Sequence, residues 1–431
     1  MKLREHGVRA ACTFGAAAIA AVLTTAPAPA APSTPPAGGS STTTTPPFTT
    51  PNTDDCPQRT LPPPPIDSSE VPAPGEPTPS ALPVPSPAIG GERMGECGVV
   101  LPEGAPAPPA DISATSWLVS DLDTGRVLAA KDPHGRYRPA STIKVALAIV
   151  ALRTLDLDTV VTGTRADADV EGTRVGIGPG GRYTNRQLMQ ALIMCSGNDA
   201  AHAIAAQLGG DKAAVAKMND LAKSLRALDT RAATPSGLDG PGMTTSAYDL
   251  SVLFREAMTI PLFAELIHTE QVDFPGYPAD PTIPDDEDHP GFPIGNDNQL
   301  LYNYAGAIGG KTGFTDDARQ TFVAAAERDG HRLVVTLLQA DVRPIRPWEQ
   351  AARLLDYGFA LDTDARIGKL PESGSAAIQP SVPLATPPPR ADGTRVEPDQ
   401  PPHQAARVAV LFGAPVLVMV LLLWIRRAYR R

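Results

Sequence analysis

Ser141-Thr-Ile-Lys144, Ser196-Gly-Asn198 and Lys311-Thr-Gly313 occur in this order along the chain, and together they decide which fold and chemistry to expect. The first stretch places a hydroxyl and an amine three residues apart. The second adds a hydroxyl and an amide, and the third adds a cation, a hydroxyl and a glycine. These groups predict a serine acyl-transfer site whose general base is a lysine.

Each short pattern is weak alone, but the lysine in the first one is unusual in this chain. The sequence has eight lysines, and only Lys144 follows a serine at a spacing of three. An arginine could not take a proton there, because a guanidinium stays protonated. The alternative interpretation is a solvated helix lysine at Lys144 and a surface turn at Lys311-Thr-Gly313; the ordered occurrence of all three motifs favours the site.

The flanks of the first motif indicate how Ser141 is presented. Residues 116–130 predict two short strands around the turn Asp123-Thr-Gly125, and the apolar run 145–152 predicts a helix. Ser141 is therefore expected at a helix N-terminus, where free N–H groups favour an oxyanion. The i, i+3 spacing places the side chains of Ser141 and Lys144 on one helix face.

With these motifs and their context, the chain resembles the low-molecular-weight penicillin-binding proteins of the D-alanyl-D-alanine carboxypeptidase family. The resemblance covers roughly residues 110–361 and includes the stretches 139–144, 194–200 and 298–315. It implies an α/β sandwich of the penicillin-binding/β-lactamase-like type. An antiparallel sheet then lies beside a helical subdomain, with the site in the cleft between them.

Several further elements of that fold are expected from the sequence. A helical block is predicted over 185–258, with breaks at Gly209-Gly210 and Pro235-Ser-Gly237. Strands are predicted at 309–313, 320–326 and 333–338, and a closing helix at 348–359.

The resemblance implies a role for each residue of the first two motifs. Ser141 is the expected nucleophile and Lys144 the expected base, which requires a lowered pKa on the lysine. Ser196 is expected to relay a proton toward the leaving amine. Asn198 is expected to orient Lys144 and to hold the substrate amide.

The third motif is expected to bind substrate. Lys311 and Thr312 would hold the terminal carboxylate of a D-Ala-D-Ala chain end, and Gly313 would let the backbone come close. The N–H of Phe314, with that of Ser141, is where the family places its oxyanion hole. Arg346 resembles a family arginine that binds the carboxylate, on spacing alone, and Arg343 is nearby.

Other function classes are disfavoured. The seven histidines lack metal-ligand spacing, so neither metal nor cofactor is predicted, and a net charge of −10 argues against nucleic acid. Cys195 is interpreted as a buried helix residue rather than a nucleophile. No glutamate lies between residues 201 and 250, so the deacylating glutamate of class A β-lactamases is missing there. β-Lactams are therefore expected to act as inhibitors.

The remaining segments predict an exported, tethered enzyme, divided as follows. Residues 1–30 are a predicted signal peptide, 31–109 a Pro/Thr-rich spacer, 110–362 the catalytic domain and 363–407 a Pro-rich linker; 408–425 are a predicted transmembrane helix and 426–431 a cytoplasmic basic tail. As a helix the apolar run spans about 27 Å, enough for a bilayer core. Export makes a Cys56–Cys97 disulfide plausible, with two free thiols as the alternative; a formed bridge would fold the spacer back as a loop against the catalytic domain.

The expected activity is D-Ala-D-Ala carboxypeptidase action on peptidoglycan stem peptides, through an acyl-enzyme on Ser141. The chain would be a single-pass membrane protein with its catalytic domain outside the cell. D,D-endopeptidase or transpeptidase activity on the same site, or a penicillin sensor without turnover, are the alternatives.

Overall fold

The computed structural model describes residues 50–362 and 364–374 of the chain. The predicted signal peptide, the transmembrane segment, the basic tail and most of the Pro-rich linker lie outside the described residues. Among the residues that are described, no helix is both long enough and apolar enough to cross a membrane.

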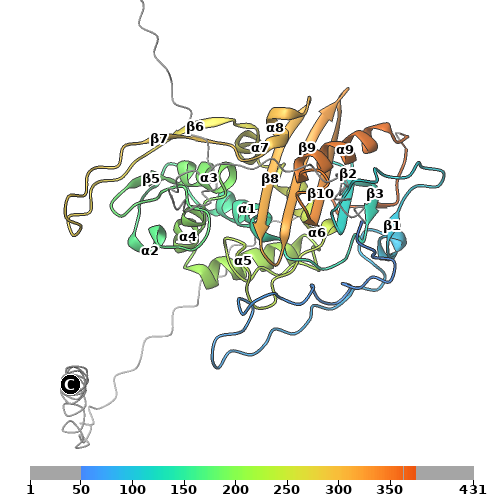
Figure 1. Cartoon of the computed structure of the whole chain (residues 1–431), viewed down its shortest axis with the longest axis horizontal. Coiled ribbons are helices and arrows are strands. Elements are labelled where there is room, and N and C mark those ends of the chain that lie inside the picture. The colour runs from blue at the N-terminus through green and yellow to red at the C-terminus, as the bar shows by residue number, and fades with distance from the viewer. Residues whose placement is uncertain (1–49, 363, 375–431) are drawn as a thin grey trace, which may run out of the picture. The chain divides into compact units, whose positions relative to one another are not determined.

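The centre of the described structure is an antiparallel sheet in the order β1-β3-β2-β10-β9-β8, with β11 also paired to β3 (Figure 1). The strands are β1 (Val99–Val100), β2 (Ser116–Asp121), β3 (Arg126–Lys131), β8 (Ala307–Thr315), β9 (Arg319–Arg328), β10 (His331–Ala340) and β11 (Gly368–Lys369). The predicted strands correspond to β2, β3, β8, β9 and β10, whereas β1 and β11 were not predicted. The Lys-Thr-Gly motif lies on the edge strand β8, where Lys311 is opposite Val323 and Gly313 opposite Thr321.

Helices cover both faces of this sheet, because strand side chains alternate between the two faces. Val119 and Val335 pack with Leu354 and Leu355 of α9 (Pro347–Ala360). Their neighbours Leu118 and Val334 face the other side, where α1 (Lys144–Thr154) and α6 (Ala247–Ala257) pack. The predicted sandwich is confirmed, with the closing helix one residue longer at each end than expected.

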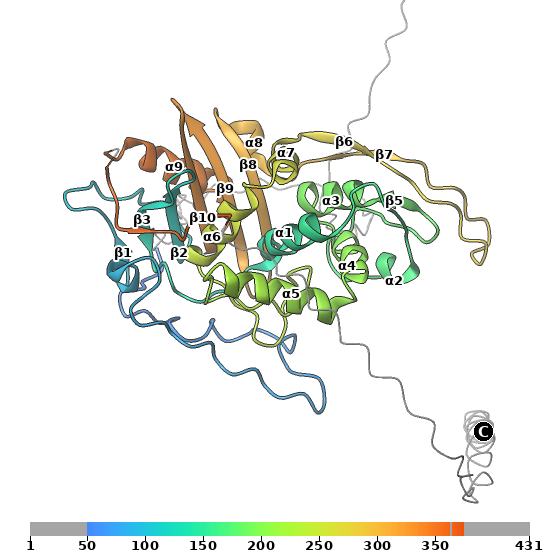
Figure 2. The ribbon, with the colours of Figure 1, turned by 180° about the vertical axis from the view of Figure 1, so that it is seen from behind.

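The helical subdomain lies beside the β8 edge of the sheet in both views (Figures 1 and 2). It contains α2 (Arg165–Ala168), α3 (Asn185–Met194), α4 (Asn198–Gln207) and α5 (Asp211–Ser224), with the small pair β4 (Val160–Thr162) and β5 (Arg182–Thr184). Thr184 caps α3 in a reciprocal pair with Gln187. The break predicted at 235–237 is present, but the irregular stretch is wider than predicted and spans 225–246, because prolines and glycines interrupt the chain there.

A second excursion from the helical block was not predicted. After α7 (Pro261–His268) the chain forms the hairpin β6 (Gln271–Phe274) and β7 (Phe292–Gly295), and returns through α8 (Gln299–Asn303). The hairpin carries the acidic stretch 280–288 and extends past α3 and β5 (Figure 1). Its return brings residues 296–298 to the cleft.

Residues 50–109, which we call the strap, fold back on the catalytic domain, as expected if the Cys56–Cys97 bridge forms. They are irregular apart from η1 (Glu92–Gly95) and β1, as the composition predicts. However, Ile89, Met94 and Val100 are buried in the hydrophobic core. The disulfide between Cys56 and Cys97 is formed. The strap therefore packs against the catalytic domain, because its few apolar side chains and its backbone carbonyls find partners there.

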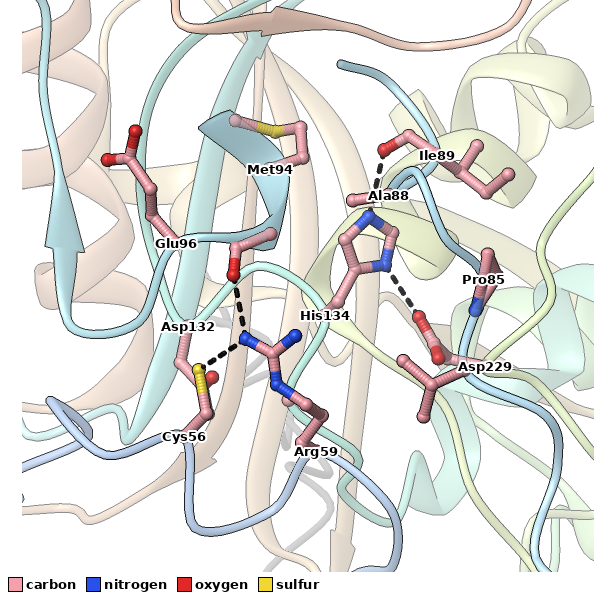
Figure 3. A pocket seen from close by; sticks show the side chains of 13 residues that line it. Cys56, Arg59, Pro85, Ala88, Ile89, Met94, Glu96, Asp132, His134 and Asp229 are labelled. Carbon is pink, nitrogen blue, oxygen red and sulfur yellow. Dashed lines mark hydrogen bonds and ion pairs between the residues drawn. The ribbon is translucent and has the colours of Figure 1, made fainter. Parts of the chain in front are cut away.

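Most of those partners lie in residues 131–138, which we call the anchor segment. The Arg136 guanidinium donates to the carbonyls of Thr60 (2.9 Å), Leu82 (2.6 Å) and Pro83 (2.9 Å). Lys131 donates to the Pro51 carbonyl, Arg138 pairs with Glu70, and His134 Nε2 lies 2.9 Å from the Ile89 carbonyl (Figure 3). The anchor segment satisfies backbone carbonyls that a proline-rich chain cannot pair with itself.

Candidate active site

Ser141 and Lys144 meet as the spacing predicts. Ser141 lies in a 3-10 turn, η2 (Ala140–Ile143), that leads directly into α1. The Lys144 Nζ lies 2.7 Å from Ser141 Oγ, and the lysine side chain is fully buried. The 3-10 turn, rather than α1 itself, carries the hydroxyl, and it leaves Ser141 partly exposed.

Two more oxygens surround the Lys144 amine. Its Nζ donates to Asn198 Oδ1 at 2.8 Å and to the Ser236 carbonyl at 2.5 Å. A neutral amine has two N–H bonds and one lone pair. When its two N–H bonds point at Asn198 and Ser236, the lone pair faces the Ser141 hydroxyl. The arrangement thus lets Lys144 accept the proton of Ser141.

The surroundings also favour the neutral amine. Burial lowers the pKa of Lys144 well below its ordinary value, and the nearby Lys311 charge lowers it further. Burial also lowers the pKa of Lys311, although the charge of Asp297 opposes that shift. The residue of the second motif that contacts Lys144 is Asn198, whose amide is uncharged. Among the described residues, no carboxylate contacts the Lys144 amine to keep it charged.

The second motif lies in the turn between α3 and α4. Ser196 is buried and has a φ of 62°. Asn198 is held on both sides: its amide donates to the Glu171 carbonyl at 2.7 Å and its backbone N–H to the Thr173 carbonyl at 2.7 Å. Cys195 ends α3 rather than lying inside a helix, and its Sγ donates to the Gly295 carbonyl at 3.1 Å.

The third motif touches the turn that carries Ser141. A Cβ added at Gly313 would lie 2.9 Å from the Ser141 backbone nitrogen and 2.4 Å from Thr321 Oγ1. Glycine is therefore required for the close approach of β8 to the nucleophile. Lys311 is fully buried, and its Nζ donates to the Thr312 carbonyl at 2.9 Å. All three motifs thus converge on one site between β8 and the helical subdomain.

Two of the predicted substrate residues, Phe314 and Arg346, lie outside the three motifs. The Phe314 side chain is exposed at the end of β8, next to Gly313. Arg346 caps α9, and its backbone N–H donates to the Glu349 carboxylate at 2.7 Å. Arg346 contacts the start of α9 and not Lys311 or Thr312, so its role in binding the carboxylate stays a prediction.

Sequence reasoning missed three contributors to the cleft. The Ser236 carbonyl on Lys144 has no signal beyond the break predicted at 235–237. Asp199 follows the second motif directly, and its carboxylate accepts the backbone N–H groups of residues 175–177 at 2.8–3.1 Å. Asp297 comes just before the quoted stretch 298–315, and it contacts Thr312. Every residue has a backbone carbonyl, so the sequence cannot reveal which one contacts Lys144. Both aspartates, in contrast, adjoin recognised motifs.

Three further chemistry-bearing residues meet beneath the strap. His134, Asp229 and Asp249 place one ligand atom each within 4.8 Å of one another. However, His134 Nδ1 is 2.6 Å from Asp229 and Nε2 is 2.9 Å from the Ile89 carbonyl (Figure 3), so both ring nitrogens already have partners. Arg136 is also 3.1 Å from Asp229. These contacts fit a protonated His134 held between Asp229 and the Ile89 carbonyl, which we call the clamp, better than a metal site. The expected lack of a metal stays a prediction.

Comparisons with known proteins agree with the geometry of the cleft. The family model described as D-alanyl-D-alanine carboxypeptidase, peptidase family S11, matches residues 103–342. The chain is 46% identical over 275 residues to the D-alanyl-D-alanine carboxypeptidase DacB2 of Mycobacterium tuberculosis, which covers 63% of this chain and 90% of that protein. It is 35% identical to DacD of Salmonella typhimurium, over 59% of this chain and 64% of that protein.

Solved structures show the same relationship. The crystal structure of the D-alanyl-D-alanine carboxypeptidase from Mycobacterium tuberculosis has a TM-score of 0.58 and 46% identity, covering 63% of this chain and all of that one. The Streptomyces K15 DD-transpeptidase has a TM-score of 0.54 and 29% identity, covering 59% and 100%. With its three motifs gathered around Ser141, the chain belongs to the D-alanyl-D-alanine carboxypeptidase family of serine peptidases.

Proposed function

We propose that Ser141 is the nucleophile and Lys144 the base of a D-Ala-D-Ala carboxypeptidase acting on peptidoglycan stem peptides. The observation that carries this proposal is the buried Lys144 amine 2.7 Å from Ser141 Oγ. A serine hydroxyl needs a base within hydrogen-bond reach, and a buried lysine beside a second cation is a base of that kind.

The acylation step follows from these positions. The Ser141 proton moves to Lys144, and Oγ attacks the carbonyl carbon between the two D-alanines. The backbone N–H groups of Ser141 and Phe314 would stabilise the oxyanion. Ser196 would pass the proton to the nitrogen of the terminal D-alanine, whose bond to the acyl carbon then breaks.

Deacylation reverses the roles. Free D-alanine leaves, and a water molecule activated by Lys144 attacks the Ser141 ester. The shortened stem peptide is released and Oγ regains its proton. In β-lactams the leaving amine stays tethered to the acyl group, so we propose that they acylate Ser141 and block the site.

The test is a comparison of the described domain with its Ser141→Ala form. We expect a fluorescent penicillin to label the unaltered protein covalently and a D-Ala-D-Ala peptide to release D-alanine. Both signals should vanish in Ser141→Ala, whereas the melting temperature should change little. Rapid hydrolysis of the penicillin, or labelling that survives Ser141→Ala, would contradict the proposal, and labelling without any D-alanine release would indicate a sensor.

A transpeptidase reaction is the second candidate, because one structural neighbour is described as a DD-transpeptidase. It would use the same acyl-enzyme, with an amine in place of water. Product analysis in the presence of a glycyl acceptor separates the two: a new amide bond indicates transfer, and free shortened peptide indicates hydrolysis.

We also propose that the chain is exported and tethered to the cell membrane by residues 408–425, with the catalytic domain outside. This proposal rests on the sequence, in which an apolar run precedes four arginines within residues 426–431. Fractionation tests it: the full chain should sediment with membranes, and a chain ending at residue 407 should not.

A further inference from the structure

Asp297 lies beside the Lys-Thr-Gly strand, at the place where the chain end of a substrate is expected. Its Oδ2 accepts the Thr312 hydroxyl at 2.7 Å and lies 3.8 Å from the Lys311 Nζ. About a third of the side chain, 35%, is exposed. A carboxylate therefore already contacts the hydroxyl that would bind the substrate carboxylate.

The backbone around Asp297 holds this carboxylate in place. Its N–H donates to the Met194 carbonyl at 2.9 Å, next to the second motif. On one side the Asn296 amide donates to the Thr269 carbonyl at 3.0 Å. On the other side the fully buried Asn298 caps α8 by accepting the Leu300 N–H at 3.0 Å. Asp297 is thus positioned by two anchored neighbours rather than by a free loop.

The negative charge of Asp297 affects both lysines of the site. Its negative charge acts to raise the pKa of both Lys144 and Lys311, against the burial that lowers them. A hydroxyl has one proton to donate. A substrate carboxylate can receive the Thr312 proton only if Asp297 gives it up, and the two anions then lie close together.

We propose that Asp297 is a specificity-determining residue that competes with the substrate's terminal carboxylate for the Thr312 hydroxyl and the Lys311 charge. It weakens the binding of anionic chain ends and carboxylate-bearing β-lactams. The inference rests on the proposed function of the cleft, and it adds a residue that opposes ligand binding there.

The test is made in a Ser141→Ala background, so that binding is measured without turnover. The probe is a peptide ending in D-Ala-D-Ala, compared with the same peptide ending in a carboxamide. We expect Asp297→Asn to tighten the free-acid peptide about tenfold, the effect of one charge-assisted hydrogen bond. The carboxamide peptide should bind equally well with and without the substitution.

A matched control removes a carboxylate from elsewhere. Asp356 lies on α9 and pairs with Arg328 at 2.6 Å; Asp356→Asn should leave both dissociation constants unchanged. In the catalytically intact protein, Asp297→Asn should speed acylation by a penicillin by lowering its apparent dissociation constant.

The outcomes separate this inference from the proposed function. Unchanged or weaker binding of the free acid in Asp297→Asn would overturn the competition, as would equal tightening of acid and carboxamide. Failure of Ser141 to form an acyl-enzyme would contradict the proposed function, but the binding comparison in Ser141→Ala would still decide the role of Asp297.

Discussion

Two groups of buried cations in this protein have opposite surroundings. In the anchor segment, Arg136 and Arg138 have side chains only 1% exposed, and each contacts a carboxylate, Asp229 or Glu70. In the cleft, Lys144 is equally buried, but its contacts are a hydroxyl, an amide oxygen and a carbonyl. A guanidinium does not give up its proton, so each anchor arginine is a permanent charge that a carboxylate offsets, whereas burial without a contacting carboxylate favours a neutral amine at Lys144 that accepts protons.

The two regions also respond to pH in opposite directions. The lowered pKa of Lys144 means that raising the pH frees the base for catalysis. At the anchor segment, burial lowers the pKa of His134, but the hydrogen bond and charge of Asp229 outweigh this effect and raise it. A rise in pH therefore favours the neutral Lys144 amine that catalysis needs, and it removes the positive charge of His134.

The largest expected effect comes from replacing the cleft base with a cation that cannot lose its proton. Lys144→Arg should slow acylation by penicillin about 10²–10⁴-fold, because a guanidinium does not serve as a base. Stopped-flow or gel labelling with a fluorescent penicillin measures this rate. Acylation within a few-fold of the unaltered protein would show that Lys144 is not the base.

The pH profile gives an independent check on the same residue. Acylation of the unaltered protein should rise with pH through an apparent pKa below the ordinary lysine value of 10.5. That limb should be missing from the residual activity of Lys144→Arg. The same limb in both proteins would assign it to another group.

In the anchor segment, removing a paired cation should lower the free energy of unfolding and not the rate of acylation. Arg136→Leu leaves three strap carbonyls without their donor and takes one partner from Asp229. We expect a loss of about 3–5 kcal/mol in unfolding free energy, measured by denaturant titration. Arg332→Leu, which removes an exposed pair with Asp123, is the matched control and should cost under about 1 kcal/mol.

The next largest loss of unfolding free energy should come from removing the disulfide. It closes a sequence separation of 41 residues within the strap, so its loss in a Cys56→Ser/Cys97→Ser double variant should cost about 2–4 kcal/mol. Limited proteolysis should then cut the strap faster than the rest of the domain. Unchanged protection of the strap would show that the anchor segment holds it without the disulfide.

The smallest expected effect is the pH dependence of the clamp. Because the folded-state pKa of His134 is raised, its stabilisation is fully present below about pH 6.5 and is lost as the pH rises through the raised value. Burial and then the Asp229 charge raise the pKa of Asp249 to about 8, which adds a loss of the same sign as the pH rises toward 8.

His134→Gln should therefore cost about 1–2 kcal/mol at pH 6 and less at pH 9. Thermal unfolding of both proteins across this range measures the difference. A difference that is constant with pH would mean that His134 is neutral in the clamp.

Much of the cleft could be predicted because its chemistry is local. Ser141 and Lys144 meet because they lie three residues apart on one turn, and the strands at 320–326 and 333–338 were predicted from their β-forming residues. The hairpin at 271–295 was missed, because its strands are short and largely exposed. The break predicted at Pro235-Ser-Gly237 is present, but the irregular segment around it, 225–246, is longer than the sequence predicted.

The strap shows the limit of composition more sharply. A proline-rich stretch cannot form a core alone, so the sequence predicted an extended spacer, or a loop folded back on the domain if the Cys56–Cys97 bridge formed. It packs nevertheless, because the anchor segment supplies donors for its carbonyls and the core accepts Met94 and Val100. Whether a segment with few apolar side chains packs depends on the surface that it contacts, and the residues of that surface lie elsewhere in the chain.

By itself, the sequence determined the reactive groups, the order of the motifs and the sheet-and-helix class, because these depend on residue chemistry and short spacings. The tertiary structure alone decided which distant groups meet: the Ser236 carbonyl on Lys144, Asp297 on Thr312 and Arg136 on the strap. Such contacts arise from packing across many residues of separation. Packing is set by the shapes and burial of whole elements and leaves no local pattern in the chain.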